Sequence, residues 1–246
     1  MPKFRLIAHR GYTLHFPENT IVGIGAAIEA GAQAVEIDIQ LTSDQVPVLF
    51  HDSDLKRVCG VDGAIHDFTL QQIQALKASE KERLGDAFER TKVATLAEFV
   101  QLMIHHPKVR IFVEIKPVAV EKFGATTILS LLHRELAPLR KRCVLISFDY
   151  EFMLGARRNG WEYLGVVLEH WADLKQQIVK DIQPQYIFFN YKKLPKTGSI
   201  KKGNSRLVLY EVTDPKLALK LAARGADYIE TFDIEKMTLL LAKHMQ

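Results

Sequence analysis

Cysteine is scarce in this chain of 246 residues, which contains only Cys59 and Cys143. A disulfide framework of the kind that holds small secreted domains together needs more cysteines, and Cys143 lies in the apolar run CVLISF, where a thiol packs as a small hydrophobic group. The residues before the first strand-like run also lack the basic, apolar and small-residue regions of a secretory leader. We therefore expect a reducing, cytoplasmic setting.

Long hydrophobic runs and an excess of one charge are absent as well. No apolar run approaches the roughly 20 residues of a membrane-spanning helix, so we expect no stable membrane insertion. The net charge is only +4, and the one lysine-rich stretch, 191–203, is interpreted as a solvated loop. Because proteins that bind nucleic acid usually carry a clustered basic stripe, we expect no nucleic-acid partner. A small anionic substrate is compatible with this charge.

The chain does contain a regular alternation of short apolar runs with helix-like segments. Eight runs have the length and composition of strands covered on both faces, namely 4–8, 34–40, 109–115, 143–148, 163–169, 186–190, 206–212 and 227–232. Helices are predicted over 19–30, 95–106, 119–136, 149–159, 171–181, 214–224 and 233–244, with N-caps at Asp149, Asp214 and Asp233. This pattern predicts an α/β fold, a (β/α)8 TIM barrel. An open doubly wound sheet is the alternative, but no glycine-rich fingerprint follows the first run.

Two segments interrupt the alternation. A second apolar run follows within 40–52, and because a parallel partner would need a longer crossover, this segment is predicted to be a hairpin. Residues 52–94 then contain no strand, so we predict a small inserted subdomain with a helix over 70–84, within a single domain of 1–246. In 191–205, proline and glycine residues predict a loop in place of a helix.

Glu36 and Asp38 stand two residues apart in the second predicted strand, so their side chains share one face. The apolar residues between and beside them would then pack beneath the helices, which places the two carboxylates in the barrel mouth. Buried carboxylates repel each other unless a positive charge neutralises them. Because hard oxygen ligands suit Mg²⁺ or Ca²⁺ better than zinc, we predict one such cation here. The alternative is that the pair faces outward and binds helix lysines.

Other polar side chains follow neighbouring strands at their C-terminal ends, the face where barrel enzymes keep their active sites. The hairpin is expected to bring His51 to the level of Asp38. The cation and Lys116 would neutralise an anionic phosphorus group, and Arg10 could bind it with two hydrogen bonds. Two histidines would act as acid and base. The full candidate set is His9, Arg10, Glu36, Asp38, His51, Glu114 and Lys116; the seven other histidines are assigned no role.

The order and spacing of HRG and PENT (9–20), EIDIQLTSDQVPVLFHD (36–52) and EIKP (114–117) resemble the glycerophosphodiester phosphodiesterase family. The resemblance implies a (β/α)8 barrel with a small insertion after its second strand. It also implies hydrolysis of a small glycerophosphodiester to sn-glycerol 3-phosphate and an alcohol. The roles implied for single residues are cation binding by Glu36, Asp38 and Glu114, acid–base catalysis by His9 and His51, and phosphate binding by Arg10 and Lys116.

Two routes remain open for the acid–base pair under this resemblance. In one of them His9 deprotonates the nucleophile, which is either water or the glycerol 2-hydroxyl, and His51 protonates the leaving alkoxide. The sequence does not distinguish this assignment from its reverse. Glu18 and Asn19 are expected to brace the first loop rather than contact phosphorus, although Glu18 could orient a catalytic group.

The C-terminal half departs from the family pattern. Where the family has Trp-Thr-Val-Asn, this chain has YEVT, so Tyr210 is expected to provide an aromatic wall for the substrate, while Glu211 changes the polarity nearby. The last predicted strand, GADYIETF, resembles the family's Gly-Val-Asp-Gly-Ile-Ile-Thr-Asp, with Phe232 where an aspartate is common. We expect these differences to affect head-group preference rather than the phosphodiester chemistry.

Two further functions and the assembly state remain open at the level of sequence. One alternative is a phospholipase D-like enzyme that acts on lysophospholipids or sphingolipids through a cyclic phosphate. The other is a non-catalytic phosphoester-binding barrel, which the two histidines disfavour because a binding protein does not need them. A homodimer is also open, since the 52–94 insertion could either cover the site or form a dimer contact.

Overall fold

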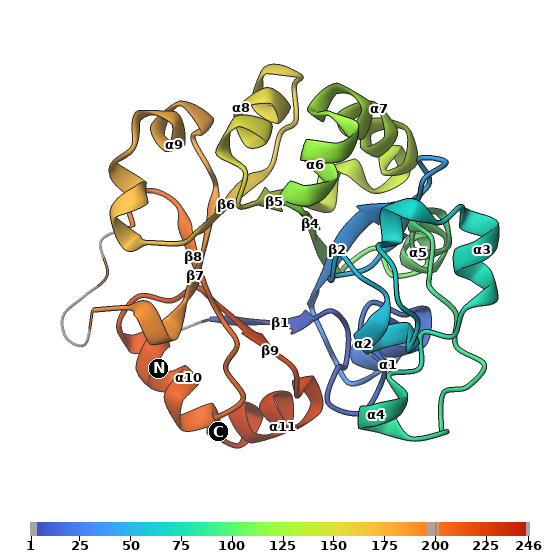
Figure 1. Ribbon diagram of the computed structural model, residues 1–246. Helices are drawn as coiled ribbons and strands as arrows, with labels where there is room; N and C mark the ends of the chain where they lie inside the picture. The colour runs from blue at the N-terminus through green and yellow to red at the C-terminus, as the bar shows by residue number, and fades with distance from the viewer. Residues whose placement is uncertain (1–3, 196–199, 201, 245–246) are drawn as a thin grey trace.

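The computed structural model describes residues 4–195, 200 and 202–244. Its core is a closed barrel of eight parallel strands, viewed along the barrel axis in Figure 1. The strands are β1 (Arg5–His9), β2 (Ala34–Leu41), β4 (Arg110–Ile115), β5 (Cys143–Ser147), β6 (Leu164–Leu168), β7 (Tyr186–Asn190), β8 (Arg206–Tyr210) and β9 (Tyr228–Thr231). Closure comes from β1, which pairs with both β2 and β9. The predicted TIM barrel is therefore confirmed.

The alternation of side chains along each strand separates two apolar regions. Outward-facing residues such as Val35, Ile37 and Ile39 pack with helix residues in the main core. Inward-facing residues fill the barrel itself, where they form a second cluster around Phe112 and Phe188. Glu36 and Asp38 alternate with these outward-facing residues of β2, so their buried carboxylates point into the barrel, as predicted.

Most of the predicted helices are present, and three of them begin at the predicted capping residues Asp149, Asp214 and Asp233. They include α1 (Ile21–Glu29), α5 (Leu96–Ile104), α8 (Tyr150–Arg158), α10 (Pro215–Ala223) and α11 (Ile234–His244). The Asp149 carboxylate accepts a hydrogen bond from the Phe152 N–H, and that of Asp214 accepts one from Lys216. Asp233 likewise accepts one from the backbone of α11 at 3.3 Å. Each cap satisfies an N–H that has no partner within its helix.

Two predicted helices are each divided in the structure. The segment 119–136 forms α6 (Pro117–Phe123) and α7 (Ala125–Glu135), because Gly124 between them has a φ of +78° that ends the first helix. The segment 171–181 forms a 3₁₀ turn, η3 (Trp171–Lys175), followed by α9 (Gln177–Ile182). There the Asp173 carboxylate binds the His170 N–H at 2.9 Å, which closes the turn on itself. A further 3₁₀ turn, η2 (Ala137–Arg142), connects α7 to β5.

The hairpin after β2 is confirmed, since β3 (Pro47–Leu49) pairs antiparallel with it. The single insertion helix predicted over 70–84 is wrong. The insertion contains α2 (Lys56–Cys59), the 3₁₀ turn η1 (Ile65–Asp67), α3 (Leu70–Ala75) and α4 (Lys81–Leu84). The helix ends at Ala75, where Leu76 becomes extended, and within the rest of the predicted helix Glu80 has a φ of +45°. The buried Glu80 carboxylate accepts the Glu18 N–H at 2.7 Å. Helix propensity depends on neighbouring residues only, so it does not predict a contact between Glu80 and a distant loop.

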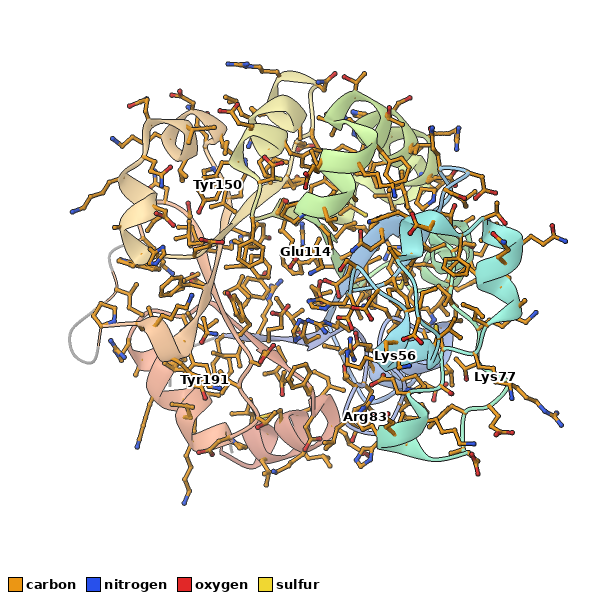
Figure 2. All side chains as sticks on the ribbon, in the orientation of Figure 1. Lys56, Lys77, Arg83, Glu114, Tyr150 and Tyr191 are labelled. Carbon is orange, nitrogen blue, oxygen red and sulfur yellow. The ribbon has the colours of Figure 1, made fainter. Side chains whose placement is uncertain are left out.

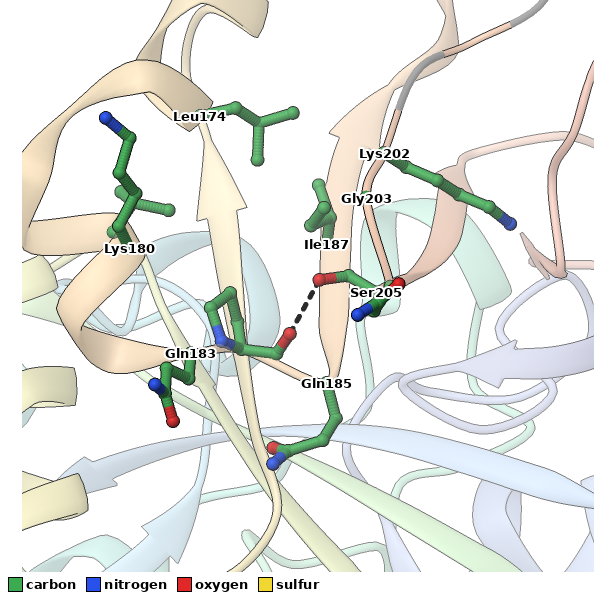
Figure 3. A pocket seen from close by; sticks show the side chains of 11 residues that line it. Leu174, Lys180, Gln183, Gln185, Ile187, Lys202, Gly203 and Ser205 are labelled. Atoms are coloured by element: carbon green, nitrogen blue, oxygen red, sulfur yellow. Dashed lines mark hydrogen bonds between the residues drawn. The ribbon is translucent and has the colours of Figure 1, made fainter.

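The connection between β7 and β8 has no α-helix in its described part, which contains only the 3₁₀ turn η4 (Tyr191–Lys193); the predicted loop 191–205 lies partly outside the described residues. A cavity of about 630 Å³ lies beside this connection, between α9 and the segment before β8 (Figure 3). Across it the Ser205 hydroxyl donates to the Pro184 carbonyl at 2.6 Å. The cavity adjoins the N-terminal ends of β7 and β8, so it is separate from the C-terminal strand ends.

Within the described residues, none of the helices is both long enough and apolar enough to cross a bilayer.

Candidate active site

The carboxylates predicted on β2 and β4 converge at the C-terminal end of the barrel. One oxygen from each of Glu36, Asp38 and Glu114 lies within 4.8 Å of the others, and Figure 2 shows Glu114 near the centre of the strand ring. Glu36 and Asp38 are 1% and 0% exposed. Register explains the arrangement, because Asp38 pairs with Glu114 across adjacent parallel strands. Ions with oxygen ligands at about 2.4 Å, such as Ca²⁺, fit between oxygens at this spacing.

Asp38 is surrounded by hydrogen-bond donors and positive charge. Lys116 Nζ lies 2.6 Å from its Oδ1, Arg10 Nε lies 3.1 Å from its Oδ2, and the Asn19 amide donates to Oδ2 at 2.8 Å. Although burial opposes ionisation, Lys116 and Arg10 hold the pKa of Asp38 well below its usual range. Lys116 also binds Glu114, and these two carboxylates raise its own pKa against the effect of burial. Asp38 is therefore ionised.

Glu36 has far less compensation. Its Oε2 accepts the Arg10 backbone N–H at 3.2 Å and lies 3.7 Å from His9 Nε2, while its buried Oε1 has no hydrogen-bond partner among the described residues. Burial and the neighbouring Asp38 raise the pKa of Glu36 well above its usual value. An unpartnered buried oxygen beside two further carboxylates fits a bound divalent cation, since such an ion would provide the missing positive charge.

His9 ends β1 in a tightly enclosed position. Its ring stacks on Phe232 with 4.9 Å between ring centroids, and its Nδ1 lies 4.0 Å from Glu211 Oε1. Burial and the nearby Arg10 lower the pKa of His9 well below 6.5. The imidazole is therefore neutral near pH 7 and able to accept a proton.

His51 follows β3 and reaches the same rim, because the Phe50 N–H binds the Asp38 carbonyl at 3.0 Å. Its Nδ1 lies 2.7 Å from Asp52 Oδ1. Arg57, in α2 of the insertion, holds Asp52 through Nε at 2.8 Å and through a second nitrogen. Sequence reasoning missed Asp52 and Arg57, although the HD pair at the end of the hairpin was a signal for the first. The insertion thus fixes the orientation of the second histidine.

The loop after β1 is braced by Glu18 and Asn19, as expected. The Glu18 carboxylate accepts hydrogen bonds from Arg57 at 2.7 Å and from Arg10 at 3.3 Å. Gly11 permits the tight path of this loop, because with its φ of +91° an added Cβ would lie 2.8 Å from the Gly23 carbonyl carbon in α1. Arg10 is therefore held between β2 and the insertion.

A further acidic residue, Glu230 on β9, was not singled out from the sequence. It is 2% exposed, and one of its oxygens lies within 4.8 Å of a His9 nitrogen and a Glu36 oxygen. Burial and the carboxylate of Glu114 raise the pKa of Glu230 above its usual value. Glu230 stands two residues after Tyr228, so the two side chains share one face of β9, but only the structure shows that this face points into the barrel.

The predicted Tyr210 ends β8, the strand next to β9. It is half-buried, and its pKa is raised by burial and by the neighbouring Glu230 charge.

The Asp52 contacts predict a pH-dependent contribution to stability. In Asp52→Asn we expect the free energy of unfolding at pH 7 to fall by about 1–2 kcal/mol, because the partly exposed carboxylate loses its charged bonds to Arg57 and His51. Despite partial burial, these two partners lower the pKa of Asp52, so its contribution is present above about pH 3.8 and is lost as the pH falls through the folded-state value. Urea unfolding of both proteins from pH 7 to pH 2 measures the difference, which should be constant above about pH 4 and shrink steadily below it. A difference that stays constant down to pH 2 would contradict the assignment.

Comparison with known proteins agrees with this geometry. The sequence model of the Glycerophosphoryl diester phosphodiesterase family matches residues 9–157, more than half of the chain. Glycerophosphodiester phosphodiesterase 1 of Bos taurus is 36% identical over 153 residues, which cover 62% of this chain and 45% of that protein. The chain thus spans about half the length of the mammalian relatives that it matches. The glycerophosphodiester phosphodiesterase of Caldanaerobacter subterraneus subsp. tengcongensis is 29% identical over 98% of this chain and 99% of its own.

Solved structures share the barrel. A phosphodiesterase from Oleispira antarctica, solved in complex with the product sn-glycerol-3-phosphate, superposes with a TM-score of 0.84 at 22% identity, over 97% of this chain and 96% of that one. A glycerophosphodiester phosphodiesterase from Agrobacterium tumefaciens gives 0.78 at 19% identity, over 96% and 99%. These likenesses support the fold, while the family sequence match, residues 9–157, includes His9, Glu36, Asp38, His51, Glu114 and Lys116. The chain belongs to the glycerophosphoryl diester phosphodiesterase family.

Proposed function

We propose that the protein hydrolyses glycerophosphodiesters to sn-glycerol 3-phosphate and an alcohol. The observation that carries this proposal is the convergence of three buried carboxylates with Lys116 and Arg10, flanked by His9 and His51, at the C-terminal end of the barrel. Family membership supports the substrate class, as does the product bound to the Oleispira antarctica relative. Small glycerophosphodiesters are thus the proposed partners of this site.

The proposed cofactor is one divalent cation, Mg²⁺ or Ca²⁺, held by Glu36, Asp38 and Glu114. When bound, such an ion supplies positive charge that stabilises the phosphate oxygens in the transition state. Lys116 and Arg10 already lie against Asp38, so their side chains are in place to bind the same phosphate group. Arg10 is held on its other side by Glu18, which limits the freedom it would lose on binding.

The environments of the two histidines support different roles in proton transfer. We infer that His9 accepts the proton of the nucleophile, because burial lowers its pKa and so keeps the ring unprotonated before the reaction. The nucleophile is water or the glycerol 2-hydroxyl; attack by the hydroxyl expels the alcohol and forms a cyclic phosphate, which water then opens to glycerol 3-phosphate. His51 is the proposed acid that protonates the leaving alkoxide. The Asp52 carboxylate, 2.7 Å from Nδ1, orients this ring.

We also propose that 1–246 acts as one phosphodiesterase domain in which 52–94 is a small subdomain. Buried side chains of this segment, with Val48 and Phe50 of the hairpin, form an apolar cluster of their own. Arg57 and Arg83 connect the segment to the loop after β1, where the Arg83 guanidinium binds the Phe16 carbonyl at 2.9 Å. The subdomain therefore supports the site from one side of the barrel (Figure 2).

An assay of glycerophosphocholine and glycerophosphoethanolamine tests the function. With a divalent cation present, ³¹P NMR is expected to show the diester signal replaced by that of glycerol 3-phosphate, and ¹H NMR to show the free alcohol in equal amount. The same assay on lysophosphatidylcholine and sphingomyelin is the comparison. A cyclic phosphate as the final product, or turnover of the lipids alone, would contradict the proposal in favour of the phospholipase D-like reaction.

A further inference from the structure

Positive charge is unevenly distributed over the carboxylates of the site. Asp38 contacts both Lys116 and Arg10, and Glu114 shares Lys116. On the side formed by β1 and β9 the compensation is missing: within the described residues, Glu230 makes no ion pair, and the only partner of this kind for Glu36 is His9 at 3.7 Å. The positive side chains of the site therefore follow β4 and β1, whereas its uncompensated carboxylates lie toward β9.

Glu230 is directed into this region. Its carboxylate, a nitrogen of His9 and an oxygen of Glu36 all lie within 4.8 Å of one another, and Glu36 also belongs to the group formed with Asp38 and Glu114. Glu230 is 2% exposed, and its buried Oε1 has no hydrogen-bond partner among the described residues. Leaving such an oxygen unpartnered costs free energy. This position is isoleucine in the family pattern that the last strand resembles, so packing alone does not require an acid here.

We propose that Glu230 is a fourth carboxylate ligand of the cation held by Glu36, Asp38 and Glu114, and that it makes the site prefer Ca²⁺ to Mg²⁺. The assignment rests on the proposed function for the presence of that cation. Ca²⁺ accepts six to eight oxygen ligands in flexible geometry, whereas Mg²⁺ keeps several waters and usually takes only one or two carboxylates. An additional carboxylate on β9 therefore favours the larger ion.

A second cation at His9, Glu36 and Glu230 would be the other way to satisfy these groups. Hard divalent cations prefer oxygen to imidazole nitrogen, and such an ion would occupy a ring nitrogen of His9. His9 is also enclosed by Phe232 and Glu211, so it has little freedom to turn toward a new ligand sphere. Because Glu36 belongs to both groups of side chains, one cation bound by all four carboxylates is a simpler arrangement than two separate ions.

Calorimetric titration of the metal-free chain with Ca²⁺ and with Mg²⁺ tests the assignment, using wild type, Glu230→Gln and a control. Glu121→Gln is the matched control, because Glu121 is an exposed residue of α6. We expect one Ca²⁺ per chain throughout, an affinity at least roughly tenfold weaker in Glu230→Gln, and a smaller change for Mg²⁺. Unchanged Ca²⁺ affinity in Glu230→Gln would overturn the proposal. Two ions in wild type and one in the variant would overturn it as well.

Thermal unfolding provides a readout that does not depend on activity. Because Glu230→Gln removes a buried, uncompensated carboxylate, its Tm in chelator is expected to equal or exceed that of wild type. Adding Ca²⁺ should then raise the Tm of wild type by more than that of the variant, through mass action. Equal increases would contradict the proposal. If the wild type binds Ca²⁺ as expected but hydrolyses no phosphodiester, only the proposed function is contradicted.

Discussion

Replacing His51 with alanine is expected to lower kcat for glycerophosphocholine by about 10²–10⁴-fold. The His51 imidazole lies at the rim of the barrel with its Nδ1 2.7 Å from Asp52 Oδ1. Its loss removes the proposed proton donor to the leaving alkoxide. His51 is partly exposed and belongs to none of the three apolar clusters. We therefore expect the free energy of unfolding to fall by about 1 kcal/mol at most, the contribution of its bond to Asp52, so that the loss of kcat reports on catalysis rather than on stability.

His105→Ala is the matched control for this variant, because His105 is exposed at the C-terminal end of α5 and lies outside the site. It should keep wild-type kcat and KM. A substrate whose leaving group needs no protonation, such as a p-nitrophenyl phosphodiester, should lose much less activity in His51→Ala than glycerophosphocholine does. Equal losses on both substrates would contradict the role of His51 as the acid, and full activity of the variant would contradict any catalytic role.

Removing divalent cations is expected to lower activity by at least about 100-fold, since the stabilisation of phosphate charge by an ion amounts to several kcal/mol. Dialysis against EDTA followed by assay in metal-free buffer measures this loss. Activity should return on addition of Ca²⁺ or Mg²⁺. In Glu114→Gln, where one of the three converging carboxylates is neutral, much higher concentrations of ion should be needed for recovery.

Two controls accompany the metal experiment. Circular dichroism of the EDTA-treated chain should show an intact fold, because Lys116 and Arg10 compensate Asp38 without any ion. Glu121→Gln should recover activity at the wild-type ion concentration. Full activity after thorough chelation, with ion content verified by mass spectrometry, would reject the metal-dependent mechanism.

The sequence predicted the barrel and the placement of its carboxylates because both depend on short-range periodicity. The alternation of polar and apolar residues in β2 is enough to put Glu36 and Asp38 on the inner face. Glu114 stands at the corresponding place near the end of the next predicted strand, and the strand pairing sets it opposite Asp38. The insertion was predicted less well. Its single helix failed because the buried Glu80 carboxylate binds the backbone of a loop 62 positions earlier, a contact that no local pattern encodes.

Glu230 was missed for a related reason. In a run of apolar residues, one glutamate is compatible with an outward or an inward position until the register with neighbouring strands is known. Pairing of β9 with β1 supplies that register, with Ile7 opposite Glu230. The significance of Glu230 depends on its buried Oε1 having no hydrogen-bond partner in the part of the chain that the structure describes, which only the three-dimensional structure reveals.

The pairing of β1 with β9 also determines when the site can form. This pairing joins residues 5–8 to residues 228–231, the most widely separated strand pair in the barrel. Contacts between such distant segments carry a large loop-closure entropy and tend to form late in folding. His9 and Glu36 acquire Glu230 as a neighbour only at this step, so a fragment that ends before β9 would contain the HRG, PENT and EIKP motifs without the fourth carboxylate. Cation binding could therefore report on the completion of folding.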